Sequence, residues 1–303
     1  MKATALAGVL LGLGAAFSQA CSYFGSRRYL TEYENRPFKV FVIAHVQMGA
    51  MVLLIPFVLD NPLPPLGAFA PYLVGTSGSY LFGQFMLLTA LTRSDSSVVA
   101  PLLGMKIPIL ALVSAGFLGV LLPWHAWLAV FLCAAAAFMV SPPRRLPQIR
   151  VLVLAILACF GYCGSDLCIP PLVAAFETAS STPALLAVCI SYTLSGGGAL
   201  IVSWRLGYIT DRKAHAYTLP YSFCWILGMC FLFACFATVG VIFGNMLQST
   251  RSFLSVIIGV FVARAGLVHI ESAKRPRVFA VRFAGAAVMT AAIVLYYSAK
   301  LSG

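Results

Sequence analysis

Two cationic side chains, Lys106 and Arg251, lie inside long apolar stretches of the sequence. A lysine or arginine at the centre of a membrane helix costs roughly 2.5–3.5 kcal/mol, so it needs a hydrated cavity, an anion or a buried partner. Lys106 is about 10 residues, or roughly 15 Å, from the nearest end of its stretch, which is too far for its side chain to reach water along the helix. Pro101 and Pro108 flank it and predict a bent helix. We expect Lys106 either to contact a negatively charged ligand or to form a structural ion pair.

Arg251 belongs to a stripe of small and polar residues that recur at spacings of three and four: Gly244, Gln248, Arg251, Ser255 and Gly259. A guanidinium can bind a carboxylate or phosphate through two parallel N–H bonds. Small residues also mark close helix contacts in membranes. The stripe therefore predicts either a cavity wall, on which Gln248, Arg251 and Ser255 bind a ligand, or a packing face that holds a structural arginine.

Asp166 is the one acidic residue well inside an apolar stretch, shortly before Pro170 and Pro171. It could be the counter-ion of Lys106 or Arg251. It could also be a coupling site that binds a proton in one conformational state and releases it in another. If the helix ended at the two prolines, Asp166 would instead lie near the outer surface.

Further polar residues lie on other apolar stretches. We expect Gln19 and Gln84 to contribute to the same binding site, and we regard His45 as a second candidate for coupling or for a counter-ion, although simple helix packing would account for all three. Cys159 and Cys163 are one helical turn apart, but no histidine or second cysteine pair completes a zinc set. We therefore predict no catalytic residue, no metal and no cofactor.

The elements that must position these residues are membrane-spanning helices. The chain has 303 residues, of which 61% are hydrophobic and 9% charged, whereas a soluble domain has roughly 25% charged residues. Spanning helices need roughly 20 mostly apolar residues, and only helices or closed barrels satisfy their backbone groups in lipid. The sequence predicts an all-α polytopic membrane protein with ten transmembrane helices. The predicted spans are 3–24, 38–59, 66–91, 95–118, 121–140, 151–174, 184–204, 219–239, 242–263 and 279–299.

The remaining basic residues lie almost entirely on one side of these ten crossings. Sixteen fall in the connections that follow odd-numbered helices or, for Lys39 and Arg282, in the first turn of the next helix, and only Lys2 and Lys300 fall on the other side. Basic loops stay in the cytoplasm, so we predict that both termini are non-cytoplasmic, in the cell (inner) membrane. The net charge of +12 therefore reports topology, and we predict no nucleic-acid partner. The sixteen are Arg27, Arg28, Arg36, Lys39, Arg93, Arg144, Arg145, Arg150, Arg205, Arg212, Lys213, Arg264, Lys274, Arg275, Arg277 and Arg282.

A competing interpretation concerns the N-terminus. Lys2, the apolar run that follows it and the residues Ser18 to Cys21 loosely match a signal peptide with a lipoprotein cleavage site. Cleavage there would require Arg27 and Arg28 to be translocated, and basic residues favour the cytoplasmic side. We therefore favour a retained first helix.

Ten spans divide into two sets of five, and an odd number in each half places the second half inverted relative to the first. A shift of 145 residues superimposes Gly83 on Gly228 and Lys106 on Arg251, so the two intramembrane cations coincide. We predict two five-helix inverted repeats, residues 1–146 and residues 147–303, with a binding site near the midplane between them.

At this level the chain resembles the EamA-type members of the drug/metabolite transporter superfamily over nearly its whole length. The resemblance is carried by the ten helices in two repeats, by residues 87–93 (LLTALTR) leading through Ala100 and Pro101, and by residues 282–287 (RFAGAA) of the last helix. It implies transport of a small metabolite by alternating access. It names no substrate, because the superfamily covers amino acids, nucleotide sugars, sugar phosphates and toxic cations.

Three functions are consistent with these observations. The leading hypothesis is a secondary transporter, not an enzyme, for a small metabolite with an anionic group, a substrate that Lys106 and Arg251 together would favour. Its expected partners are this substrate and membrane lipid. The sequence allows coupling to a proton or another ion and does not determine the oligomeric state. A flippase for a lipid or lipid phosphate is the first alternative. An integral membrane enzyme that modifies lipid is the second, although the sequence shows no paired acids, histidine cluster or metal set for it.

Overall fold

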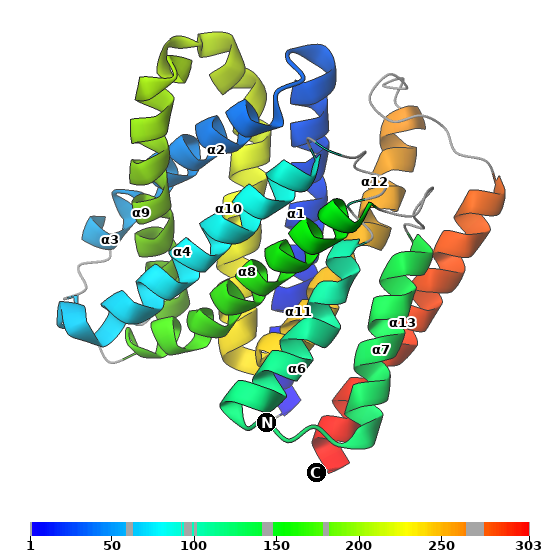
Figure 1. The fold of residues 1–303 in the computed structure, drawn as a ribbon. Helices are drawn as coiled ribbons and strands as arrows, with labels where there is room; N and C mark the ends of the chain where they lie inside the picture. The colour runs from blue at the N-terminus through cyan, green and yellow to red at the C-terminus, as the bar shows by residue number, and fades with distance from the viewer. Residues whose placement is uncertain are drawn as a thin grey trace.

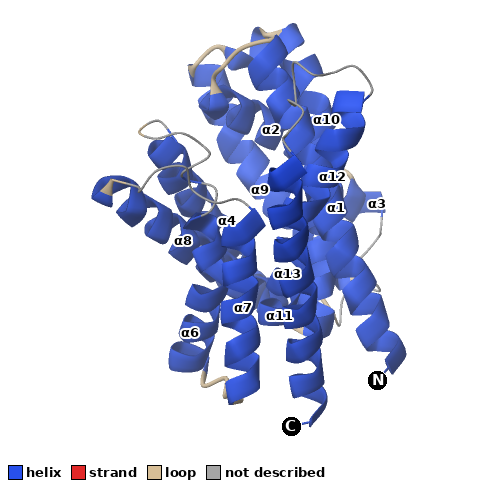
Figure 2. Ribbon diagram, turned by 90° about the vertical axis from the view of Figure 1, so that its right-hand side faces the viewer, coloured by secondary structure: helices blue, strands red, loops and turns tan. Residues whose placement is uncertain are grey.

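The computed structural model describes residues 2–58, 63–91, 93, 99, 102–140, 148–177, 182–264 and 276–302. Within these ranges the regular structure is helical throughout (Figure 2). The elements are α1 (Lys2–Glu32), α2 (Pro37–Val52), α3 (Ile55–Val58), α4 (Leu66–Leu91), η1 (Leu103–Met105), α6 (Lys106–Leu118), α7 (Trp124–Val140), α8 (Ile149–Ala174), α9 (Pro183–Arg205), η2 (Tyr208–Thr210), α10 (Arg212–Val239), α11 (Val241–Ser249), α12 (Arg251–Arg264) and α13 (Pro276–Ser302).

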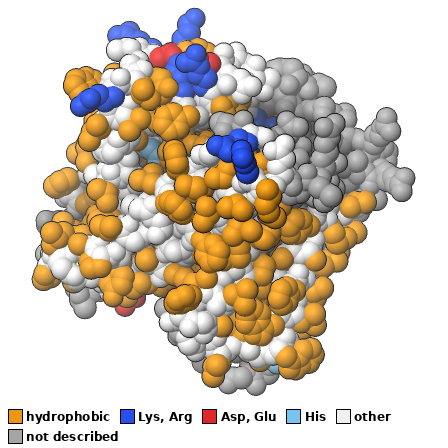
Figure 3. Space-filling view, viewed as in Figure 1, with side chains coloured by type: hydrophobic (Ala, Val, Ile, Leu, Met, Phe, Trp, Pro, Cys, Tyr) orange, Lys and Arg blue, Asp and Glu red, His pale blue; other side chains and the backbone are white. Residues whose placement is uncertain are grey.

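Among the described residues, six stretches of helix are long and apolar enough to cross a membrane: Leu6–Glu32, Pro37–Val58, Ile149–Ala174, Pro183–Arg205, Arg212–Val239 and Val241–Gly259. The apolar helices at Leu103–Phe117, Trp124–Met139 and Phe283–Ser298 are shorter. Large hydrophobic side chains such as Phe57, Phe117 and Leu121 are exposed. Hydrophobic side chains cover much of the face of the molecule that Figure 3 shows. In water such a surface would be costly, whereas acyl chains solvate it freely. The chain is therefore an integral, polytopic membrane protein.

Two of the predicted spans are interrupted. The second breaks at Leu53 and Leu54, between α2 and α3, and the ninth breaks at Thr250, between α11 and α12. In the fourth span, the 3₁₀ turn η1 precedes Lys106, and Pro108 falls in the first turn of α6, where a missing N–H costs nothing. Most of the predicted residues 95–101, including Pro101, lie outside the described residues. Lys106 and Arg251 are thus each the first residue of a helix that follows a tight turn.

Helices far apart in the sequence pack side by side. The most extensive contacts join α1 with α10, α4 with α8, α2 with α9 and α7 with α13. Glycines allow the closest approaches, as is usual where helices pack in lipid. A Cβ on Gly161 of α8 would lie 2.7 Å from the Cα of Gly83 on α4, and one on Gly49 of α2 would lie 2.9 Å from the Cα of Gly196 on α9. Side chains larger than hydrogen at these crossings would push the helices apart.

The first helix is an integral part of this packing. α1 runs without interruption through Cys21, and Ser18, Gln19 and Ser22 are buried against other helices. The residues that loosely match a cleavage site are therefore the middle of a packed helix, which favours the retained helix over the signal peptide.

Both described chain ends lie at the lower end of the molecule, whereas the turns between α1 and α2 and between α9 and α10 lie at the upper end (Figure 1). Lysine and arginine side chains gather at this upper end (Figure 3), which we call the basic face. At the basic face Lys39 Nζ lies 2.7 Å from both Glu34 Oε2 and Asp211 Oδ2. Tyr33 donates its hydroxyl to Asp211 Oδ1 at 2.7 Å, and the Ala214 N–H donates to the same oxygen at 3.0 Å. This cluster joins the α1–α2 turn to the start of α10.

Asp211 is expected to make stability depend on pH. The hydrogen bonds from Lys39, Tyr33 and the Ala214 N–H favour its carboxylate and lower the pKa of Asp211 well below its usual range. The pKa of an aspartate in the unfolded chain is about 3.9. Because the pKa of Asp211 is lower in the folded state, its carboxylate stabilises the fold fully above the unfolded-state pKa. This contribution is lost as the pH falls from there through the folded-state pKa. Asp211→Asn should therefore lower the unfolding free energy by about 1–3 kcal/mol at pH 7, and the difference from wild type should shrink below about pH 4.

Thermal unfolding in detergent from pH 3 to pH 8 measures this effect. Glu32→Gln is the control, because its pair with Arg28 is at the surface and contributes little. An Asp211→Asn penalty that stays constant down to pH 3 would show that the charge of Asp211 is not responsible.

Candidate functional site

A cavity of about 240 Å³ lies between α1, α4, α6, α8, α10, α11 and α12. It extends from Gln248 and Arg251 to Leu30, Pro37 and Val40, which belong to the ends of α1 and α2 near the basic face. The cavity brings together six of the eight binding or coupling residues predicted from sequence: Gln19, Gln84, Lys106, Asp166, Gln248 and Arg251.

Lys106 is held in an ion pair. Its Nζ lies 2.6 Å from Asp166 Oδ2, and the two side chains are 13% and 9% exposed. Asn245 on α11 donates its amide to the same carboxylate oxygen at 2.7 Å, and the Lys106 ammonium also lies 5.7 Å from the centre of the Tyr162 ring. α8 continues past Pro170 and Pro171, so the interpretation that placed Asp166 near the outer surface is wrong. The positive charge of Lys106 is therefore compensated within the protein.

Arg251 is held by neutral groups. Its Nη1 donates to Gln19 Oε1 at 2.9 Å, and Gln248 Nε2 donates to the same oxygen at 3.0 Å. The guanidinium carbon lies 5.7 Å from the centre of the Tyr23 ring. Among the described residues no carboxylate lies within ion-pair distance of Arg251. The two cations predicted from sequence thus differ: the described part of the cavity carries one compensated and one uncompensated positive charge.

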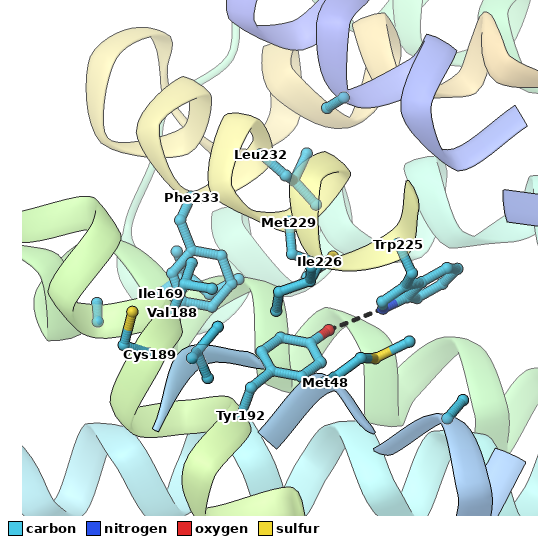
Figure 4. Packing of buried hydrophobic residues seen from close by; sticks show 14 of the residues in the cluster. Met48, Ile169, Val188, Cys189, Tyr192, Trp225, Ile226, Met229, Leu232 and Phe233 are labelled. Atoms are coloured by element: carbon cyan, nitrogen blue, oxygen red, sulfur yellow. Dashed lines mark hydrogen bonds between the residues drawn. The ribbon is translucent and has the colours of Figure 1, made fainter. Parts of the chain in front are cut away.

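Aromatic side chains form much of the remaining wall: Tyr23, Tyr80, Tyr162, Tyr221 and Trp225. Gln84 Nε2 donates to the Tyr80 hydroxyl at 3.3 Å. Trp225 is fixed by its Nε1–H, which donates to Tyr192 OH at 2.8 Å in the buried cluster behind the wall (Figure 4). Such rings offer flat apolar surface with a polar edge.

Sequence reasoning missed the tyrosines at 23, 80 and 162 and also Asn245. An isolated tyrosine in an apolar helix is equally consistent with packing, so no local signal separated these three from the rest. Asn245 did carry a signal, because it lies three residues before Gln248 and therefore on an adjacent part of the same helical face.

Ser255 and His45 do not line the cavity. The Ser255 hydroxyl donates to the Arg251 carbonyl of its own helix at 2.7 Å, an internal bond typical of serine in apolar helices. The His45 ring is fully buried, and its Nδ1–H donates to the Phe41 carbonyl at 2.8 Å. Its ring centre lies 5.7 Å from that of Tyr80, which places His45 behind the cavity wall.

A second cavity, of about 700 Å³, lies toward the opposite end of the molecule. It is lined mainly by apolar residues of α10, α11 and the turn before α7, with Ser114 of α6 and Tyr296 of α13, and none of the described lining residues is charged. Its size would suit a larger, mainly apolar ligand. Two residues of its wall are close in sequence to the Lys106–Asp166–Asn245 cluster: Leu167 follows Asp166, and Phe243 lies two residues before Asn245. Lys106 and Asp166 of this cluster line the central cavity.

Comparisons with known proteins agree with this architecture. Residues 6–141 match the EamA-like transporter family. No curated protein matches the chain. Among the solved structures that match, one described only as "Crystal structure of protein" superimposes with a TM-score of 0.63 over 95% of both chains at 13% sequence identity, a likeness that shows the fold alone. Members of the EamA family are membrane transporters of small molecules, not enzymes. Residues 6–141 of this integral membrane protein are thus similar to the EamA-like transporter family, which is part of the drug/metabolite transporter superfamily.

Proposed function

We propose that the protein is a secondary transporter for a small metabolite with one anionic group, bound at Arg251 in the central cavity. The observation that carries this proposal is the Arg251 guanidinium, which lines the cavity and has only neutral partners in the part of the chain that the structure describes. An uncompensated cation in a low-dielectric site attracts an anion and repels a cationic substrate. The guanidinium has five N–H donors, of which Gln19 uses one, so a carboxylate could still be bound at two points.

The charge balance favours a single negative charge on the substrate. Lys106 and Asp166 neutralise each other at 2.6 Å, which leaves Arg251 as the net charge of the described site. A monoanion would cancel that charge, whereas a dianion would leave one negative charge in a poorly solvated cavity. The aromatic wall suits a substrate whose remainder is apolar or flat.

The packing supports two inverted repeats, residues 1–146 and 147–303. If α1, α2, α4 and α7 of the first half correspond to α8, α9, α10 and α13 of the second, a two-fold operation exchanges the α1–α10 contact with the α8–α4 contact. The same operation maps the α2–α9 and α7–α13 contacts onto themselves, and all four are the most extensive contacts of the fold. Lys106 and Arg251, which the 145-residue shift superimposes, each begin a helix after a tight turn.

The positions of the two cavities support alternating access. The central cavity reaches the helix ends at the basic face, and the second cavity lies toward the opposite end of the molecule. In this proposal the Lys106–Asp166–Asn245 cluster closes the path between them. Under the positive-inside rule the basic face is cytoplasmic and both termini are on the other side. The structure would then represent an inward-facing state, and substrate would cross when this cluster separates.

Counterflow in proteoliposomes tests the proposal. Vesicles loaded with an unlabelled candidate should accumulate the same labelled compound, and the panel should include aromatic and aliphatic monocarboxylates, dicarboxylates and quaternary ammonium ions. We expect exchange of at least one class of monocarboxylate, inhibition by other monocarboxylates and no inhibition by the cations. Exchange of quaternary ammonium ions with no effect of any carboxylate would refute the anionic assignment.

A further inference from the structure

A small chamber with hydroxyl groups on its wall adjoins the central cavity. Its volume is about 20 Å³, enough for one occupant of the size of a water molecule. It shares Tyr80, Ser165 and Met229 with the central cavity, so the two spaces are neighbours. The hydroxyls come from three helices, α4, α8 and α9: Thr76, Ser77, Tyr80, Ser165, Ser191, Tyr192 and Ser195.

Three of these hydroxyls are buried without a protein hydrogen-bond partner. Among the described residues, no hydrogen-bond partner is found for Thr76 Oγ1, Ser77 Oγ or Ser191 Oγ. These residues are only 4%, 5% and 3% exposed, respectively. Helical serines and threonines normally satisfy their hydroxyls on a carbonyl of the preceding turn, as Thr89 and Thr218 do here. Three unsatisfied oxygens around one small chamber indicate a shared occupant.

The chemistry of the ligands limits what that occupant can be. The oxygens are neutral, and the described residues contain no group of three or more histidine, cysteine or acidic side chains that could hold a metal. Calcium and magnesium use carboxylate oxygens, and transition metals use imidazole or thiolate. Neutral oxygens in a space of one water volume suit an alkali cation.

We propose that this chamber is a binding site for one sodium or potassium ion that is coupled to the anion site. Only the coupling to the anion site rests on the proposed function; cation binding by the chamber does not. An alkali cation in the chamber would attract an anion bound at Arg251. Without the anion, Arg251 would repel the cation. Each ligand should therefore raise the affinity for the other by the same factor, because binding linkage is reciprocal.

Cation binding is tested on the purified protein without any organic substrate. Thermal unfolding is measured in sodium, potassium or choline chloride at equal ionic strength, together with binding of ²²Na⁺. We expect sodium or potassium, but not choline, to raise the midpoint by about 3–5 °C, the shift expected when the ion is well above its dissociation constant. The cation that gives the larger shift is the preferred one. Equal midpoints in all three salts, with no saturable ²²Na⁺ binding, would show that the chamber holds water only and would overturn the proposal.

Matched variants assign the effect to the chamber. Ser191→Ala and Thr76→Val remove one hydroxyl each with little change in volume and should abolish the cation-dependent shift, whereas Thr76→Ser keeps an oxygen and should retain it. Ser203→Ala is the control, because Ser203 lies on the same helix, is also buried without a described partner, and is not part of the chamber. A cation shift that persists in both Ser191→Ala and Thr76→Val would overturn the site.

Arg251→Ala separates this inference from the proposed function. In this variant sodium or potassium should still raise the unfolding midpoint. Added monocarboxylate should no longer change the size of that rise. If wild type shows no cation shift but exchanges monocarboxylates equally in choline and sodium media, the cation site is refuted and the transporter proposal stands. If the cation shift is present but no monocarboxylate changes it, the anion proposal fails and the cation site stands.

Discussion

Replacing Arg251 by alanine is expected to weaken binding of an anionic substrate by about 100-fold and to abolish measurable transport. Loss of one partner of a buried, charge-assisted contact costs roughly 2–5 kcal/mol. Gln19 Oε1 would still accept a hydrogen bond from Gln248, so the fold should survive the change. Arg251→Lys keeps the charge but not the planar fork, and we expect about a 10-fold loss. Substrate-induced thermal stabilisation and counterflow measure both effects.

Arg264→Ala is the matched control for this experiment. Arg264 ends the same helix, α12, and its side chain is exposed, so its loss should leave affinity and transport unchanged. Normal exchange by a correctly folded Arg251→Ala protein would exclude Arg251 from the substrate site. Equal losses in both variants would point to a non-specific effect of positive charge.

Breaking the Lys106–Asp166 pair is expected to produce the largest loss of stability. Removing one member of a buried ion pair leaves an uncompensated charge and costs about 3–5 kcal/mol, whereas removing both can be nearly neutral. Lys106→Met should therefore lower the unfolding free energy by that amount, and Lys106→Met combined with Asp166→Asn should recover at least half of it. The asparagine can still accept the amide hydrogen bond from Asn245. Unfolding of the two single variants and the double variant completes a double-mutant cycle.

The exposed Arg28–Glu32 pair supplies the reference cycle, since a surface pair contributes only about 0.2–1 kcal/mol. The same double variant also separates stability from transport. If the pair closes the path between the two cavities, the double variant should fold but exchange substrate with altered rate. Purely additive losses at positions 106 and 166 would show that the two side chains do not stabilise each other.

Local properties of the sequence were sufficient for the class of protein and for most of the polar residues of the cavity. Hydropathy is a property of each segment alone, so the apolar segments can be identified from the sequence. A charge inside such a segment is costly in lipid, so Lys106, Arg251 and Asp166 are identified as residues that need a partner or a hydrated cavity. The resemblance to EamA-type transporters is confirmed over residues 6–141. The ten-helix count, the division at residue 146 and the cytoplasmic side of the basic loops stay predictions.

Tertiary structure decided which of these residues meet. Asp166 could have paired with either cation, and only the packing of α8 against α6 and α11 gives it to Lys106 and leaves Arg251 with Gln19 of α1, 232 positions away. Helix packing also places four tyrosines in the cavity wall and His45 behind it. Insertion into lipid depends on the composition of one segment at a time, whereas the partner of a buried charge depends on glycine-mediated contacts between segments far apart in the chain. For that reason the sequence identifies the charges, and the fold determines which of the two cations has an acidic partner among the described residues.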